Sequence, residues 1–260
     1  MKTIIFIHGA WVTPKCWDSF KGYFESLGYR VLAPAWPGKE EAIEEQQKTP
    51  SPKLAGLGIR EIVEHYAKII ETESEPPILI GHSFGGLFVQ MLLDRGLGKM
   101  GIAIDPAPPK GVFAFYPSAA WSLRYPLLRP WKRNKILRWP FSHFQYAFVN
   151  TLTLEEQKKA YRDFVVPETA RIFWQAALAP VNTVPYVNFK NDTRAPLLII
   201  AGEKDHIVPA VINRGNYKKY AGSRAVTDFK EFSGRTHWII AQPGWEEVAG
   251  YCEGWIKKYL

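Results

Sequence analysis

The sequence predicts an α/β fold built on a parallel sheet of six strands with helices on both faces. Short apolar runs alternate along the chain with segments whose apolar residues recur at helical spacing. Such alternation is typical of a parallel sheet, because right-handed crossover helices pack on both of its faces. In addition, the polar motifs follow apolar runs. We therefore expect these motifs to meet beyond the carboxyl ends of the strands.

The predicted elements are placed as follows. Strands are expected at Thr3–Ile7, Tyr29–Ala33, Pro77–Ile80, Gly101–Ile104, Leu197–Ala201 and Val226–Phe232. Helices are expected at Cys16–Leu27, Ile59–Ile70 and Trp245–Tyr259, where apolar residues fall on one helical face. The charged connector 37–58 is expected to be a loop with a short surface helix. Residues 106–185 break the alternation, since they are rich in proline and aromatic residues.

Composition sets the class of protein. The chain has 260 residues, 47% of them hydrophobic, which suits one α/β domain with an insertion. No stretch approaches the roughly 18 apolar residues of a membrane span, and the N-terminus lacks the pattern of a signal peptide. Cys16 and Cys252 indicate no disulfide framework, so a cytoplasmic location is expected. No cluster has metal-ligand spacing, and neither a metal nor a cofactor is expected.

The net charge of +8 is concentrated in one segment. Between Asp105 and Glu155 there is no acidic residue. The same stretch holds Lys110, Arg124, Arg129, Lys132, Arg133, Lys135 and Arg138. Such residues most often form a solvated face, and the alternative is steering of anionic substrates or contact with an anionic surface. The chain has no nucleic-acid motif, so nucleic-acid binding is not expected.

The most informative motif is Gly81-His82-Ser83-Phe84-Gly85-Gly86, which lies between an apolar run and the helix-like stretch 87–93. A strand, a tight turn and a helix in this order form a G-x-S-x-G nucleophile elbow. The turn crowds its own neighbours, so the positions two before and two after the serine must be glycine. The serine itself must take a strained backbone conformation. The motif therefore predicts Ser83 as a nucleophile.

Two further motifs follow strand-like runs later in the chain. Asp205 lies in Gly202-Glu203-Lys204-Asp205-His206-Ile207-Val208-Pro209, and His237 lies in Gly234-Arg235-Thr236-His237-Trp238. The order serine, aspartate, histidine is that of α/β-hydrolases. The sequence resembles this family over nearly its whole length, and most closely its small esterase-type members.

The resemblance implies a fold and roles for residues. It implies an α/β-hydrolase core at 1–105 and 186–260, with an inserted helical cap at 106–185. His237 would be the general base and Asp205 the acid that orients it. Asp105, which ends a predicted strand, is a rival acid, and Glu203 is a weaker one. The backbone N–H groups of Ala10 and Phe84 would form the oxyanion hole. The substrate pocket is expected to be lined by Trp11, His82, Trp121 and Trp238.

The expected reaction is hydrolysis of a carboxylic ester through an acyl-enzyme. Dehalogenases and epoxide hydrolases of this fold carry aspartate where this chain has Ser83, and hydroxynitrile lyases carry lysine at the position of Trp238. Lactone, thioester or carbon–carbon bond hydrolysis on the same triad remains open, as does a ligand-binding protein without activity. The expected partner is a small ester with an apolar part, and the oligomeric state is left open.

Overall fold

The computed structural model describes residues 2–179 and 184–260. Its main sheet has six strands in the order β2-β1-β3-β4-β7-β8, all parallel to their neighbours. The strands are β1 (Thr3–Ile7), β2 (Arg30–Leu32), β3 (Ile78–His82), β4 (Met100–Ile104), β7 (Leu197–Gly202) and β8 (Thr227–Phe232). The prediction of six parallel strands is confirmed, and the bounds differ from the expected ones by at most two residues.

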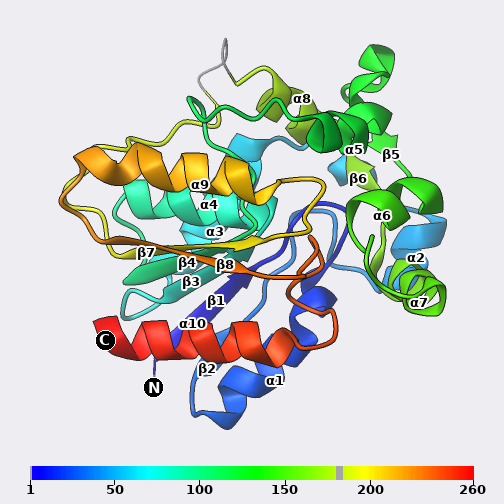
Figure 1. Ribbon diagram of the computed structural model, residues 1–260. Coiled ribbons are helices and arrows are strands. Elements are labelled where there is room, and N and C mark those ends of the chain that lie inside the picture. The colour runs from blue at the N-terminus through cyan, green and yellow to red at the C-terminus, as the bar shows by residue number, and fades with distance from the viewer. Residues whose placement is uncertain (1, 180–183) are drawn as a thin grey trace.

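Helices cover both faces of this sheet (Figure 1). One face carries α1 (Asp18–Ser26) and α10 (Trp245–Tyr259), and the other carries α3 (Ile59–Glu71), α4 (Phe84–Asp94) and α9 (Ala210–Lys219). The central strands β1, β3, β4 and β7 are almost wholly buried, as expected for parallel strands covered on both sides. This buried sheet provides the rigid support on which the loops at its carboxyl edge are held.

The segment between β4 and β7 lies beyond one end of the sheet (Figure 1). It contains α5 (Pro117–Leu127), the short 3-10 helix η3 (Pro130–Lys132), α6 (Phe141–Ala147), α7 (Leu154–Phe164) and α8 (Arg171–Ala177). It also contains an antiparallel pair, β5 (Ile136–Leu137) with β6 (Glu168–Thr169), which the sequence did not predict. Strands of two residues are too short to show alternation. The part of the predicted cap at 180–183 lies outside the described residues.

The connector 37–58 is less exposed than its charge suggested. It contains the predicted short helix, α2 (Ile43–Lys48), and the turn η2 (Pro52–Leu54). The Lys39 side chain is fully buried, where its Nζ lies 2.6 Å from Glu168 Oε2 and donates to the Val12 carbonyl at 3.0 Å. Burial is the main cause that lowers the pKa of Lys39, and Glu168 opposes it. A buried ion pair therefore joins this connector to the 106–185 segment.

The helices and the two cysteines bear on two expectations from the sequence. Among the described residues, no helix is both long and apolar enough to cross a bilayer. Cys16 and Cys252 are both buried and both free. Burial raises the pKa of each thiol well above its ordinary value, so both behave as small apolar side chains of the core.

Candidate active site

Ser83 occupies the tight turn between β3 and α4. Its φ of 57° and ψ of −121° are rare for a residue with a side chain. A Cβ at Gly81 would lie 2.2 Å from the Gly85 carbonyl oxygen, and one at Gly85 would lie 2.0 Å from the Ile7 carbonyl oxygen. Both positions therefore accept only glycine. The crowding has the physical origin that the motif predicted, and it presents the serine at the carboxyl edge of the sheet.

Ser83 faces an apolar cavity. The cavity has a volume of about 560 Å³ and is lined by Ser83 together with Ala10, Trp11, Phe84 and Phe173. Most of its remaining lining comes from residues 107–128, 139, 148 and 176–179, in the 106–185 segment. Its size and apolar walls are typical of a site for a small organic ligand. A nucleophile at one end of such a space would meet the polar end of an otherwise apolar ligand.

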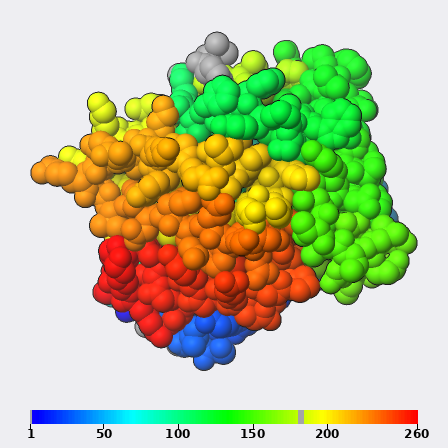
Figure 2. All heavy atoms as spheres, viewed as in Figure 1, coloured from blue at the N-terminus to red at the C-terminus, as the bar shows by residue number. Residues whose placement is uncertain are grey.

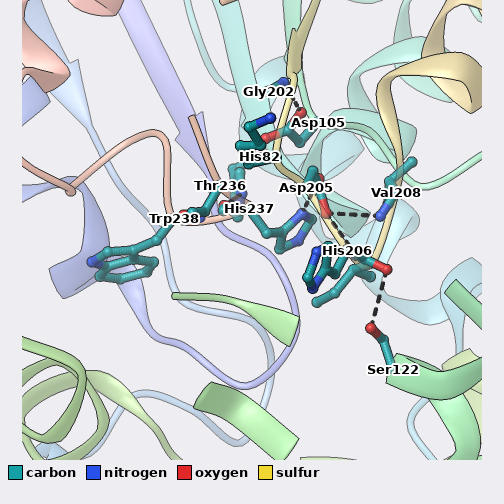
Figure 3. Close-up of polar contacts among 12 residues, drawn as sticks. His82, Asp105, Ser122, Gly202, Asp205, His206, Val208, Thr236, His237 and Trp238 are labelled. Atoms are coloured by element: carbon teal, nitrogen blue, oxygen red, sulfur yellow. Dashed lines mark hydrogen bonds and ion pairs between the residues drawn. The ribbon is translucent and has the colours of Figure 1, made fainter. Parts of the chain in front are cut away.

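Asp205 and His237 lie in contact beyond β7 and β8 (Figure 3). Asp205 Oδ2 lies 2.6 Å from His237 Nδ1, and both side chains are fully buried. The other carboxylate oxygen accepts from the backbone N–H groups of Ile207 and Val208, at 2.7 and 2.9 Å. With Nδ1–H donated to the carboxylate, the neutral imidazole carries its lone pair on Nε2. The pair therefore presents an oriented base.

His237 Nε2 has no hydrogen-bond partner among the described residues. Its ring packs against His82, which precedes Ser83, and against Phe148, each with ring centroids 4.7 Å apart. No hydrogen bond from Ser83 Oγ to this nitrogen is present in the described part of the chain. An unpaired buried polar atom costs about 1–3 kcal/mol. The site would therefore be stabilised by a proton donor at this position, such as a rotated serine hydroxyl or a ligand.

Asp105, the rival acid, has different partners. Its Oδ1 accepts from the Gly202 backbone N–H at 2.7 Å, and its Oδ2 has no partner in the described residues. Burial, and secondarily the charge of Asp205, raise the pKa of Asp105 well above its ordinary value. Asp105 therefore keeps its proton to a higher pH than an exposed carboxyl group does, whereas Asp205 is the carboxyl group that contacts the imidazole of His237.

His82, Asp105 and His237 form a compact buried group. Each offers one potential ligand atom, and these atoms lie within 4.8 Å of one another. The sequence indicated no such group, because its members follow three different strands. His82 Nε2 donates to the His237 carbonyl at 2.8 Å, and burial lowers the pKa of His82 well below its ordinary value. The neutral His82 ring therefore fixes the backbone of the histidine loop, and we assign no cation to this group.

His8 orders the loop after β1. The Trp36 N–H donates to His8 Nε2 at 3.2 Å, so the ring proton is on Nδ1, which donates to the Gly9 carbonyl at 2.8 Å. Burial, followed by the charge of Lys39, lowers the pKa of His8 well below its ordinary value. The Gly9 carbonyl shares a peptide plane with the N–H of Ala10. His8 therefore orients the first predicted oxyanion donor.

The two predicted oxyanion donors are available. Among the described residues, neither the Ala10 nor the Phe84 N–H donates to another group, and both residues line the cavity beside Ser83. The N–H of Trp11 is occupied, since it donates to Glu168 Oε2 at 3.0 Å. This acceptor and its partner Lys39 belong to no motif, so the sequence offered no signal for them.

Of the four residues expected to line the substrate pocket, one lines the cavity beside Ser83. Trp11 lines the cavity, stacked on Trp139 and Phe173. His82 is not among the lining residues, because it is turned toward the His237 loop. Trp238 is also buried elsewhere, against Phe148 and Phe164. Trp121 is 56% exposed and carries the Arg124 guanidinium on its ring. The aromatic composition of 106–185 indicated an apolar pocket, but it could not show which rings turn inward.

The acid loop is attached to the 106–185 segment. His206, next to Asp205, contacts the Tyr146 carbonyl through Nδ1 at 2.9 Å, and its own carbonyl accepts from Ser122 Oγ at 3.1 Å (Figure 3). The weaker rival acid, Glu203, instead accepts from Ser233 Oγ and the Gly234 N–H on an exposed loop. The position of Asp205 thus depends partly on the residues that wall the cavity.

Comparison with known proteins agrees with this fold. The model of the alpha/beta hydrolase family matches residues 4–249. A monoacylglycerol lipase from Paleococcus ferrophilus is 20% identical, with a TM-score of 0.72 over 99% of this chain and 95% of its own. An extracellular alpha/beta-hydrolase from a Paenibacillus species is 21% identical, with a TM-score of 0.71 over 96% of this chain and 97% of its own. A methylesterase from Arabidopsis is 15% identical, with a TM-score of 0.70 over 99% of both chains. No curated protein matches. At these identities the solved structures establish the fold alone, and the location of this chain stays a prediction.

Proposed function

This chain belongs to the alpha/beta hydrolase family, and on that premise we propose that it is a serine hydrolase that cleaves carboxylic esters through an acyl-enzyme. One observation carries the proposal. His237 is held by Asp205 in the tautomer that leaves Nε2 free, and its ring packs against His82, the residue before a strained serine that lines an apolar cavity. Esterase and lipase names among the structural neighbours support the same class of reaction.

In the proposed mechanism His237 Nε2 removes the proton of Ser83 Oγ while that oxygen attacks the ester carbonyl carbon. Asp205 keeps the imidazole in place and stabilises its protonated form. The imidazolium then protonates the departing alcohol, and the acyl group remains on the serine. Finally His237 takes a proton from water, whose oxygen attacks the acyl carbonyl carbon. The bond from that carbon to Ser83 Oγ then breaks, the imidazolium returns the proton to Oγ, and the acid is released. The requirement is that Ser83 Oγ rotates toward the unpaired Nε2.

Negative charge on the carbonyl oxygen would be met by the N–H groups of Ala10 and Phe84. Phe84 begins α4, whose N-terminus adds a favourable dipole. His8 would hold the Ala10 peptide in its productive orientation through the Gly9 carbonyl. Preorganised donors of this kind each contribute roughly a hundred- to a thousandfold in rate.

The 106–185 segment is proposed to act as a cap that selects the substrate. It supplies most of the cavity wall, and that wall is apolar. A substrate with an apolar acyl or alcohol part would therefore gain binding energy by leaving water. The ester group would be the polar end that reaches Ser83.

The test is hydrolysis of p-nitrophenyl esters with acyl chains of two to twelve carbons. We expect turnover by the native chain and a loss of at least a thousandfold in Ser83→Ala. Ser142→Ala is the matched control, since Ser142 is an exposed serine of the same segment that does not line the cavity, and it should keep the native activity. A lactone and an acyl thioester in the same assay rank the other acyl substrates. An unchanged rate in Ser83→Ala, or failure of a fluorophosphonate to label Ser83, would overturn the proposal.

A further inference from the structure

An exposed group of large apolar side chains lies in the first part of the 106–185 segment. Phe113, Phe115, Leu128 and Trp131 are 69, 77, 68 and 72% exposed, and Trp121 is also largely exposed. Scattered exposed apolar residues are normal on proteins, whereas a concentration within about twenty residues of chain indicates a surface that meets an apolar partner.

Basic side chains are interleaved with these apolar ones. Trp131 is followed directly by Lys132 and Arg133, which are exposed, and then by Lys135. Arg124 stacks on Trp121 at 3.9 Å and Arg129 on Tyr125 at 4.2 Å. In the described part of the chain none of these five basic residues forms a salt bridge. No acidic residue occurs between Asp105 and Glu155, so this stretch of chain supplies no counter-charge.

The same residues mark an opening of the cavity. Phe113, Phe115 and Leu128 line the cavity and are also largely exposed, so its wall continues there into the outer surface. Arg124 belongs to the lining as well. In Figure 2 the green atoms that include this part of the chain form the upper and right-hand edge of the molecule, away from α1 and α10. We call this group the mouth surface (Phe113, Phe115, Trp121, Arg124, Leu128, Arg129, Trp131, Lys132, Arg133 and Lys135).

We propose that the mouth surface binds the surface of an anionic lipid bilayer. Aromatic and aliphatic side chains enter the boundary between headgroups and acyl chains, while lysine and arginine contact lipid phosphates. A negative membrane surface attracts such basic residues, and each contributes roughly fivefold in affinity. The same stretch of chain thus offers both charge complementarity and an apolar contact. A lipid surface matches this combination better than a nucleic acid or a soluble anionic substrate does.

Two other partners fit these observations less well. A nucleic acid would meet the positive charge, but it would leave Leu128 and Phe113 exposed at the entrance of an apolar cavity. A soluble anionic substrate would be attracted by the charge, but it gives no role to Trp131, which is exposed and lies outside the cavity lining. A bilayer gives a role to both sets of side chains.

The proposal has a consequence for the substrate, which rests on the proposed esterase function. Since the cavity opens at the mouth surface, an amphiphilic ester could pass from the bilayer into the cavity with its apolar chain leading. Binding to the bilayer itself requires no catalysis. The two proposals can therefore fail separately.

Binding is measured by sedimentation of Ser83→Ala protein with phosphatidylcholine vesicles that contain 0 or 30% phosphatidylglycerol. We expect at least tenfold tighter binding to the anionic vesicles at low salt, and most of this binding should be lost in high salt. The triple variant Lys132→Gln/Arg133→Gln/Lys135→Gln should bind roughly a hundredfold more weakly. Trp131→Ser should weaken binding several-fold in the same assay.

Matched controls remove the same charge and a comparable apolar side chain elsewhere. Lys99→Gln/Lys218→Gln/Lys219→Gln changes three exposed lysines at the amino edge of the sheet, and Leu27→Ser changes an exposed leucine after α1. These variants should bind like the parent within about twofold. With Ser83 restored, Trp131→Ser and the basic triple variant should hydrolyse a soluble neutral ester at the native rate. That result would show that both variants are folded.

Several outcomes would overturn the proposal. One is equal binding to neutral and anionic vesicles, and another is an equal loss in the two lysine triple variants, which would reflect net charge alone. Tighter binding to duplex DNA than to anionic vesicles would assign the surface to nucleic acid. A raised KM for a soluble anionic ester, without any vesicle binding, would assign it to substrate steering.

Discussion

The carboxyl edge of the sheet and the 106–185 segment hold their polar groups in opposite ways. At the sheet edge, Asp205, His237 and His82 are buried, and each is fixed by hydrogen bonds to backbone or to one another. In the 106–185 segment Lys132, Arg133 and Lys135 are exposed and form no salt bridge with any described residue, while apolar rings face both cavity and solvent. Fixed polar groups suit chemistry that needs atoms at set positions. An exposed surface that mixes basic and apolar side chains suits a partner that has no single fixed shape.

The two regions are nevertheless joined by a few buried polar contacts. Lys39 and Glu168 connect the loop after β2 to the β5–β6 pair, and Glu168 also holds the Trp11 N–H. On the opposite side, the Trp238 N–H donates to the Phe148 carbonyl at 3.1 Å, close to the His237 loop. Changes in one region should therefore reach the other chiefly through these contacts. The separation between the sheet edge and the 106–185 segment can be tested by substitutions in each region.

The largest effect is expected when the carboxyl group of Asp205, rather than that of Asp105, is replaced by an amide. Asp205→Asn should lower kcat about ten-thousandfold, because an amide favours the wrong imidazole tautomer. Asp105→Asn should leave kcat within a few-fold of native, because the amide oxygen can still accept from the Gly202 N–H. Steady-state kinetics of the two variants on one soluble ester show which carboxyl group the reaction requires. If Asp105→Asn were as inactive as Asp205→Asn, the acid would have to be reassigned.

The second effect is on stability, at the junction of the two regions. Glu168→Gln should lower the free energy of unfolding by about 3 kcal/mol, because it leaves the Lys39 ammonium buried without a counter-charge. The amide can still accept from the Trp11 N–H. Urea unfolding is the measurement.

Adding Lys39→Met to Glu168→Gln is the matched control, since it removes the uncompensated charge. The double variant should recover part of the lost stability, despite losing the bond to the Val12 carbonyl. A double variant less stable than Glu168→Gln alone would show that the charge was not the cause.

The sequence predicted the first region better than the second for physical reasons. Gly81, Ser83 and Gly85 leave the elbow no alternative conformation. The long buried strands appear in the sequence as strong apolar runs, so the loops that carry Asp205 and His237 could be placed directly after them. Nothing comparable constrains residues 106–185. Trp121 and Trp139 look alike in sequence, yet one ring is exposed and the other buried. Their direction depends on helix packing that no local pattern encodes.

The same reasoning explains the buried charges that the sequence did not reveal. Lys39 lies in a stretch rich in charged residues, and Glu168 is 129 positions away. A lysine in such a stretch is normally solvated. Only the fold brings the two together, so their partnership could not be inferred from spacing.

A third, smaller effect is expected at the oxyanion loop. His8→Phe keeps a ring to stack on Trp36 but removes the hydrogen bond that holds the Gly9–Ala10 peptide. We expect kcat to fall about ten- to a hundredfold, less than the full loss of one donor, with a smaller change in KM. His65→Phe is the matched control, because His65 contacts a backbone carbonyl outside the site. Equal losses in both variants would indicate a general packing effect.

The last effect is a pH dependence of stability that belongs to the sheet edge alone. The pKa of Asp105 is raised in the folded state by burial, then by Asp205. Above its unfolded pKa of about 4, the unfolded chain releases this proton while the folded chain retains it, so this group makes folding less favourable as pH rises. Asp105→Asn removes that cost. The variant should be more stable than the native chain at pH 7, by about 1.4 kcal/mol for each unit of pKa difference, with the gain shrinking toward pH 4.

Urea unfolding of both proteins at pH 4, 5.5 and 7 measures this difference. The basic triple variant of the mouth surface is the comparison, because Lys132, Arg133 and Lys135 are exposed and form no salt bridge with the residues that the structure describes. Its stability should follow that of the native chain at every pH. A gain for Asp105→Asn that is constant from pH 4 to pH 7 would mean that Asp105 ionises normally in the fold. In that case the ionisation of a buried group at the sheet edge would change the free energy of unfolding no more than the exposed charges of the mouth surface do.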